Sequence, residues 1–205
     1  MRKISAGIIL VLLLTGMLAL AIDIRQVKAS GTIYIRADGS IDPQTAPIST
    51  LDNVTYTLTG DISDPVVIER GSIVVEGAGQ RAIGMGAEGS IGMYLSGRSN
   101  VTLVNIEITR FNYRTRLYYS SNNRIFHNNF NDNIRQTYID PDGYNAWDDG
   151  YPSGGNFWSD YAGVDTDGDG IGDTPYVIDQ NNKDYHPLIK PYVVGGSNHD
   201  WKNKL

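Results

Sequence analysis

A repeat of 22 residues constrains the fold of this chain more than any other feature of its sequence. Sliding the sequence along itself by 22 residues brings Ser-Asn pairs and apolar positions into coincidence. The matched positions are Leu95 with Leu117, Ser99 with Ser121, Asn100 with Asn122, Leu103 with Ile125, and Ile108 with Phe130. A repeat of this length that carries short strands and no helix is typical of one turn of a parallel β-solenoid, whose equivalent apolar side chains stack inside. We therefore expect Leu103 to stack on Ile125 and Ile108 on Phe130.

Short β-branched runs bounded by Gly, Asn and Ser predict strands along the chain, and no stretch has the apolar spacing of a helix. The runs cover residues 32–35, 65–68, 73–75, 101–104 and 106–108. An earlier turn fits at a shift of 28, with residues 73–77 on 101–105 and the excess in the Gly-rich segment 84–89. The predicted fold class is all-β. An antiparallel sandwich is the alternative, although Asn-Gly hairpin signals are missing between the repeats.

Two asparagines stand where the repeating chain must turn. Asn100 and Asn122 occupy the same position of consecutive repeats. Asparagine tolerates the left-handed backbone conformation and can bond to its own backbone or to the next turn of the solenoid. We expect both residues to lie in turns between strands.

The N-terminus has the pattern of an export signal. Arg2 and Lys3 precede an almost uninterrupted apolar stretch over residues 4–22, and Val27 and Ala29 are suited to cleavage after position 29. An uncleaved anchor is the alternative, because about nineteen apolar residues is near the minimum that spans a bilayer. Both interpretations place the rest of the chain outside the cytoplasm, secreted or at the cell surface. A membrane is then contacted only through the N-terminal segment, if that segment is uncleaved.

Charge and cysteine content exclude several classes of function. The full chain has a net charge of −6, and without residues 1–29 it carries 13 basic and 22 acidic residues, a net charge of −9. This balance argues against nucleic acid as a partner, because nucleic acids bind to positive surfaces. The chain has no cysteine, so disulfides and thiolate metal sites are excluded. Its core, its backbone pairing or a bound metal must therefore hold the fold.

The sharpest local motif is Asp-Thr-Asp-Gly-Asp-Gly-Ile-Gly-Asp over residues 165–173. Four carboxylates, a Gly turn and a free carbonyl provide the hard oxygen ligands that calcium prefers. The predicted calcium ligands are Asp165, Asp167, Asp169, the carbonyl of Ile171, and Asp173, with Asp160, Asp179 and Asp184 as further candidates. The loop is not a full EF-hand, because Tyr176 stands where a bidentate Glu is expected. A solvated acidic turn is the alternative.

Four segments carry a resemblance to a known family. They are residues 75–79 (VEGAG), 95–102 (LSGRSNVT), 120–130 with Ser-Ser-Asn-Asn and His-Asn-Asn-Phe, and the tail from Asn145 through the Asp loop to Asp184. Together they resemble the pectin-lyase-like β-helix proteins described as NosD-like, or as carbohydrate-binding and sugar-hydrolysis (CASH) repeats, of the archaeal type. The resemblance implies a short right-handed parallel β-helix with an Asp/Gly/aromatic-rich C-terminal cap.

The same resemblance carries a copper-related label from an accessory protein of nitrous oxide reductase maturation. The residues of this chain do not favour a copper site, because soft metals are bound by clustered His, Cys or Met side chains. This chain has three histidines and, after signal removal, two methionines: His127, His186, His199, Met85 and Met93. The chain also departs from the family by being short, which leaves little concave surface for a ligand.

Aromatic residues cluster among Gly and Asp in the C-terminal segment. The open end of a solenoid has to be covered, and aromatic side chains can cover it. Alternatively, exposed aromatic faces form a platform for sugars. The candidate glycan contacts are Trp147, Tyr151, Trp158 and Tyr161.

The predicted organisation is a signal peptide or anchor over 1–29, β-helix coils over 30–138, a cap with the calcium loop over 139–192, and a flexible tail over 193–205. No catalytic residue is predicted, since Asp148 and Asp149 are adjacent and Glu107 has no evident carboxylate partner. We expect a non-catalytic, calcium-stabilised extracellular or cell-surface module for adhesion or for binding a polysaccharide or cell-surface glycan. The alternatives are a polysaccharide lyase or glycoside hydrolase, and a NosD-like periplasmic metal-delivery accessory protein.

Overall fold

The computed structural model describes residues 31–132, 135–139 and 143–195, and these residues form strands and turns without any helix. The prediction of an all-β fold is confirmed. The predicted export signal lies outside the described residues, and so does the tail beyond residue 195. No helix among the described residues is long and apolar enough to cross a membrane.

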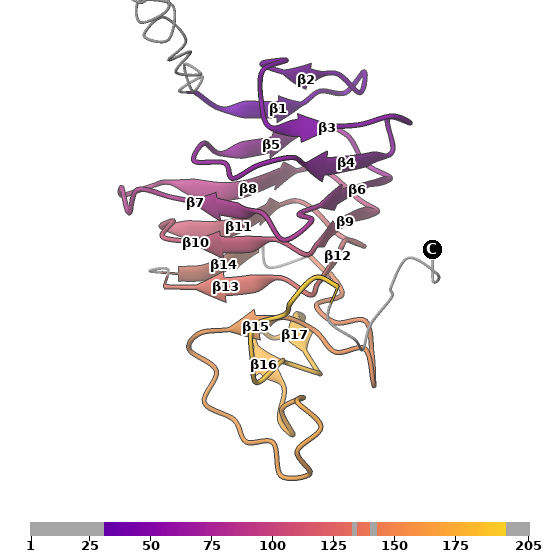
Figure 1. The fold of residues 1–205 in the computed structure, drawn as a ribbon. Helices are drawn as coiled ribbons and strands as arrows, with labels where there is room; N and C mark the ends of the chain where they lie inside the picture. Colours follow the sequence, from indigo (N-terminus) through magenta and orange to yellow (C-terminus); the bar gives the residue numbers. More distant parts are fainter. Residues whose placement is uncertain (1–30, 133–134, 140–142, 196–205) are drawn as a thin grey trace, which may run out of the picture.

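Three sheets make up most of the described chain (Figure 1). The first has the strand order β14 (Arg135–Ile139), β11 (Tyr113–Tyr118), β8 (Ile91–Ser96), β5 (Val66–Ile68), β1 (Ile33–Ile35), β2 (Ile41–Asp42). The second has the order β12 (Arg124–Phe126), β9 (Val101–Val104), β6 (Ile73–Glu76), β4 (Thr55–Leu58), β3 (Ile48–Ser49). The third has the order β15 (Phe157–Trp158), β13 (Asn129–Asn131), β10 (Glu107–Thr109), β7 (Arg81–Ile83). A separate hairpin joins β16 (Tyr176–Val177) to β17 (Lys183–Asp184).

The chain visits the three sheets in turn, and we call one such passage a coil. Strands β8, β9 and β10 form one coil and β11, β12 and β13 the next, and equivalent strands pair in parallel. The register places Leu103 beside Ile125 and Ile108 beside Phe130, at the predicted offset of 22 residues. Both predicted stacks are confirmed. The parallel pairing between coils also excludes the antiparallel sandwich.

The preceding coil confirms the predicted shift of 28 only for its second strand. Ile73 pairs with Val101, whereas Arg81 pairs with Glu107 at an offset of 26. Part of the excess therefore lies in the turn over residues 77–80, and only the remainder lies in the Gly-rich segment after β7. The turn is close to its neighbour, because a Cβ on Gly77 would meet the Asn105 carbonyl oxygen at 2.1 Å.

The sheets are not parallel throughout, and this differs from the predicted parallel fold. Strand β2 pairs antiparallel with β1, and β3 pairs antiparallel with β4. Both antiparallel strands lie at the N-terminal ends of their sheets in Figure 1. An open strand edge is a template for unwanted pairing, and these folded-back strands cover two such edges.

Columns of apolar side chains fill the space between the sheets. Ile35, Ile68, Leu95 and Leu117 occupy one column of the first sheet, and each is at most 1 % exposed. Burying one such side chain contributes roughly 1.5–3 kcal/mol. The same cluster continues into the C-terminal segment through Trp147 and Trp158.

Left-handed turns recur at equivalent positions of successive coils. Asn100 and Asn122 have φ angles of 58° and 60°, as predicted for these turns. At the next corner Asn105 and His127 have φ angles of 60° and 55°. The coils therefore repeat the conformation of their corners as well as that of their strands.

Candidate metal centre

Asparagine side chains connect the coils to residues 143–192, the part of the predicted cap over 139–192 that follows β14 and is called the cap below. In a first ladder, Asn123 Oδ1 accepts the Val101 N–H at 2.9 Å, and Asn145 Oδ1 accepts the Asn123 N–H at 3.1 Å. Asn182 Oδ1 then accepts the Asn145 N–H at 3.0 Å. Each side chain satisfies a backbone donor of the coil before it, which buried backbone groups require.

A second ladder runs parallel to the first. Asn128 Oδ1 accepts the Ile106 N–H at 3.1 Å, and Asn156 Oδ1 accepts the Asn128 N–H at 3.1 Å. Asp184 Oδ2 ends the ladder by accepting the Asn156 N–H at 2.7 Å. Asn182 and Asp184 are neighbours in the β16–β17 hairpin, so both ladders fix this hairpin to the coils.

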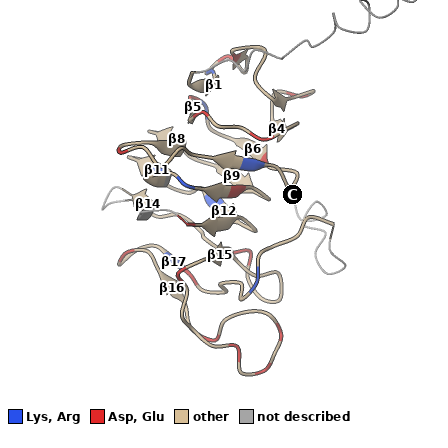
Figure 2. Ribbon diagram, turned by 60° about the vertical axis from the view of Figure 1, so that its left-hand side comes forward, with Lys and Arg blue, Asp and Glu red and all other residues tan. Residues whose placement is uncertain are grey.

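The Asp/Gly loop is attached to the chain that follows the hairpin. The Gly172 N–H donates to the Pro187 carbonyl at 2.8 Å, and the Ile189 N–H donates to the Gly170 carbonyl at 3.0 Å. Its acidic residues mark the lowest loops of the cap in Figure 2. The C-terminal half of the loop is therefore held against a segment that the ladders position.

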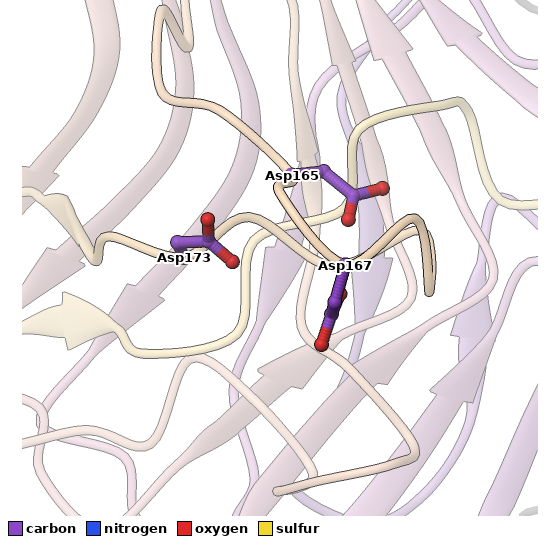
Figure 3. A group of neighbouring side chains, drawn as sticks. All are labelled: Asp165, Asp167 and Asp173. Atoms are coloured by element: carbon purple, nitrogen blue, oxygen red, sulfur yellow. The ribbon is translucent and has the colours of Figure 1, made fainter.

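Three of the predicted calcium ligands converge. One carboxylate oxygen from each of Asp165, Asp167 and Asp173 lies within 4.8 Å of the others (Figure 3). The Asp165 carboxylate accepts the N–H groups of Gly168 at 2.7 Å and Gly170 at 3.0 Å. Asp173 accepts the Thr166 N–H at 3.0 Å across the loop. The loop is thus closed by its own backbone donors, with three carboxylates side by side.

The fourth carboxylate does not join this group. Asp169 Oδ1 accepts the Ile171 N–H at 2.8 Å, and Ile171 itself lies in a backbone bridge with Leu188. The further candidate Asp160 accepts the Tyr176 hydroxyl at 3.2 Å, and Asp179 accepts the Asn182 N–H at 2.8 Å. These hydrogen bonds connect segments of the cap to one another.

Hydrogen bonding keeps the Asp165 carboxylate charged. Desolvation raises the pKa of Asp165, but the N–H donors of Gly170 and Gly168 outweigh it and hold the pKa below its ordinary value. A carboxylate that accepts several backbone donors favours its charged form. Asp165 therefore offers a charged oxygen donor at any pH near neutrality.

Asp184, a further candidate for calcium binding, is a buried carboxylate. It is fully buried and accepts the Trp158 Nε1–H at 2.9 Å and the His186 N–H at 3.0 Å. Burial raises the pKa of Asp184 to about 7, although its N–H donors from Asn156, Trp158 and His186 act in the opposite direction. A Cβ on Gly155 would meet Asp184 Oδ1 at 1.9 Å, so the carboxylate fills its site. It completes the second ladder and is closed to solvent.

The aromatic residues of the cap cover the end of the core. Trp147 is fully buried and Trp158 is 1 % exposed, so neither can contact a glycan, because their rings lie inside the protein. The Trp158 ring stacks on Phe130 at 4.5 Å and on Tyr176 at 4.2 Å. Tyr161 is half-buried and donates its hydroxyl to the Thr174 carbonyl at 2.6 Å. Of the four predicted glycan contacts, only Tyr151 is widely exposed, at 68 %.

No histidine of the described residues belongs to a group of three or more His, Cys, Asp or Glu side chains that could hold a metal ion. The buried His127 places Nε2 at 2.9 Å from the Ser153 carbonyl oxygen and stacks its ring on Tyr192. His186 contacts Asp148 through Nδ1 at 3.0 Å. Met93 is a core residue and Met85 is 85 % exposed in the Gly-rich segment, while His199 lies outside the described residues.

In comparisons with known proteins, the chain matches the model of one protein family. A family model described as periplasmic copper-binding protein (NosD) matches residues 52–163, which include strands β4 to β15 and end before the Asp/Gly loop. No curated protein and no solved structure matches the chain. The described residues do not fit copper, because the one group of His, Cys, Asp or Glu side chains among them that could hold a metal contains no histidine and supplies only hard oxygen donors. Since the match covers more than half of the chain, this protein belongs to the NosD family.

Proposed function

We propose that this protein is an exported, non-catalytic module, stabilised by calcium, that acts in adhesion or in polysaccharide binding as a secreted or cell-surface protein. Its coils form a short right-handed parallel β-helix of the CASH type, and residues 139–192 form its cap. The parallel register between coils supports the helix. The family description, which names a periplasmic protein, supports export.

The convergence of Asp165, Asp167 and Asp173 carries the calcium part of the proposal. Three like charges at such separations repel one another, and a divalent cation among them turns this repulsion into attraction. Calcium takes six to eight oxygen ligands at about 2.3–2.6 Å in a flexible geometry. The three carboxylates supply a large part of this shell, and the Asp169 carboxylate and the Ile171 carbonyl are the nearest groups in sequence to complete it.

The contacts of other acidic side chains support a non-catalytic role. The Asp149 carboxylate accepts from Arg124 at 2.6 Å and from Ser153 at 2.7 Å. Asp148 contacts His186, as described above, and Glu107 accepts from Asn131 Nδ2 at 3.3 Å. Glycosidases instead need two facing carboxylates that reach the substrate. Release of reducing or unsaturated sugars from a polysaccharide would identify the alternative, a hydrolase or lyase.

Thermal unfolding with calcium and with a chelator tests the proposal. A ligand at a hundred times its dissociation constant stabilises a folded protein by about 2.7 kcal/mol, which is about 5–10 °C for a domain of this size. We expect this rise with calcium, and its loss in Asp165→Asn and Asp173→Asn. Asp38→Asn is a matched control, because Asp38 is an exposed turn residue that accepts the Ser40 N–H far from the cap. Equal melting temperatures with calcium and with chelator would remove calcium from the proposed function.

A further inference from the structure

A row of aromatic and basic residues crosses the outer face of the first sheet. The register aligns Tyr34, Val67, Tyr94, Arg116 and Tyr138 on neighbouring strands. Strand residues alternate between two faces, and the neighbours of this row in sequence point into the core. Strands β8, β11 and β14, which carry the last three members, lie side by side in both views (Figures 1 and 2). Adjacent members are therefore spaced by about 4.8 Å, the distance between paired strands.

Arg116 lies in the middle of three tyrosine rings. Its guanidinium carbon is 5.4 Å from the centroid of Tyr138, 5.6 Å from that of Tyr94 and 5.8 Å from that of Tyr118. Tyr119, which is 67 % exposed, packs edge-on against Tyr118 and extends the aromatic surface sideways. The rings hold the guanidinium group by cation–π attraction and shield it from water on several sides.

The guanidinium group of Arg116 lacks an anionic partner among the described residues. Its Nε is buried and makes no hydrogen bond there. By contrast, Arg36, Arg81 and Arg124 each pair with at least one carboxylate. The charge of the Arg116 guanidinium group is therefore not neutralised by a carboxylate of the described residues, and an anion supplied from outside would be favoured beside it.

We propose that this face binds a carboxylated polysaccharide, with a uronate carboxylate on Arg116 and sugar rings on Tyr94, Tyr118 and Tyr138. The planar fork of arginine matches a carboxylate in two parallel hydrogen bonds. Tyrosine rings offer rigid apolar faces that cost little side-chain entropy when a sugar packs on them. This proposal rests on the polysaccharide-binding role above and gives it a ligand class and a site outside the cap.

The charge of the protein selects against denser polyanions. Duplex DNA carries one negative charge per about 1.7 Å and needs many basic contacts. This chain has a net charge of −6. Among the described residues, one guanidinium group, that of Arg116, lies between the rings of Tyr94, Tyr118 and Tyr138. A polymer with at most one carboxylate per sugar fits one guanidinium group between aromatic faces better than a polyphosphate does.

Calorimetric titration of the exported protein with oligogalacturonate tests the proposal. Oligomers of a few sugars are too short to gel with calcium, so the titration is run in the calcium buffer that stabilises the protein under the proposed function. We expect binding to oligogalacturonate and at least about tenfold weaker binding to its methyl-esterified form, which lacks the charge. Arg116→Gln should weaken binding by about tenfold or more, and Tyr138→Ala should also weaken it. Arg36→Gln is the control for net charge, because Arg36 also lies over a tyrosine, 3.9 Å from the Tyr34 ring centroid, but pairs with Asp42 and Glu69.

The possible results distinguish failure of the Arg116 site from failure of the polysaccharide-binding function. Equal affinities of wild type and Arg116→Gln, with unchanged melting temperatures, would overturn the Arg116 site. Equal affinities for the esterified and the charged oligomer would show glycan binding without recognition of the carboxylate. The polysaccharide-binding function would then be supported, and the proposed uronate site at Arg116 would be rejected. If Arg116→Gln does not fold, Tyr138→Ala decides, because Tyr138 is already 40 % exposed. Failure of wild type to bind acidic and neutral glycans alike would remove both the inference and the polysaccharide role.

Discussion

The stacked coils and the C-terminal cap are held together by different physics. In the coils, side chains such as Leu103 and Ile125 form apolar columns and the strands pair along their backbones. In the cap the strands are two residues long, and buried polar side chains such as Asn156, Asn182 and Asp184 make the connections. Burial of apolar surface does not depend on protons or metal ions, whereas carboxylates depend on both. The two regions should therefore fail under different conditions.

Truncation in a coil should give the largest effect. Leu103→Ala removes most of a side chain that is 1 % exposed, so we expect a loss of about 2–5 kcal/mol in the free energy of unfolding. Denaturant titrations in calcium and in chelator should give the same loss, because the column contains no ionisable group. Leu51→Ala is the control, since Leu51 is fully exposed and should change the stability by less than about 0.5 kcal/mol. A calcium-dependent loss for Leu103→Ala would break the distinction between the two regions.

Removal of a ladder side chain should cost somewhat less. Asn156 donates through Nδ2 to the Ile125 and Trp147 carbonyls and accepts the Asn128 N–H. Asn156→Ala leaves these buried groups without partners, and we expect a loss of about 2–3 kcal/mol in unfolding free energy. Asn156→Asp keeps the shape but adds a carboxylate beside Asp184, so its loss should be larger at pH 8 than at pH 5. A loss below about 0.5 kcal/mol for Asn156→Ala would show that the ladder does not stabilise the cap.

A change of one pH unit should have the smallest and most specific effect. The folded protein holds the Asp184 proton more tightly than the unfolded chain, because burial raises the pKa from 3.8 to about 7. The stabilisation is complete below the unfolded pKa and is lost as the pH rises through 7. Between these values the free energy of unfolding should fall by about 1.4 kcal/mol per pH unit.

Asp184→Asn tests this slope, because the amide keeps one acceptor oxygen and cannot ionise. Denaturant titrations of wild type and variant from pH 4 to pH 8 should show a smaller decrease in the variant. Parallel pH profiles of the two proteins would mean that the Asp184 carboxylate is charged in the folded state across this range.

The coils were predictable from sequence because their energetics repeat at a fixed spacing. Leu103 over Ile125 follows from the offset of 22 residues, and the same offset separates Tyr94, Arg116 and Tyr138. The sequence therefore contains the row, but a repeat defined by apolar and asparagine positions does not include it. A sequence pattern that requires the same residue type at every repeat does not detect this column, because its members alternate between aromatic and basic side chains.

The cap was less predictable because its contacts join residues at unequal spacings. The first ladder steps 22 residues from Asn123 to Asn145 and then 37 residues to Asn182. The second ladder steps 28 residues from Asn128 to Asn156 and 28 more to Asp184, where a carboxylate replaces an amide. The acidic pattern did identify Asp165, Asp167 and Asp173 as neighbours, since loop closure brings residues so near in sequence together. Which carboxylate turns away depends on backbone donors, as with Asp169 and the Ile171 N–H, and composition does not determine this.

The two asparagine ladders also restrict how such a chain can change length during evolution. Each rung satisfies a backbone N–H of the coil before it, and the last rungs, Asn182 and Asp184, belong to the cap. Duplicating 22 residues within the coils would add one rung to each ladder and leave both ends unchanged. Inserting a few residues into a strand would shift both ladders out of register at once, although the loop after β7 tolerates extra residues because no ladder passes through it. Growth by whole coils is therefore the change that this architecture accepts most easily.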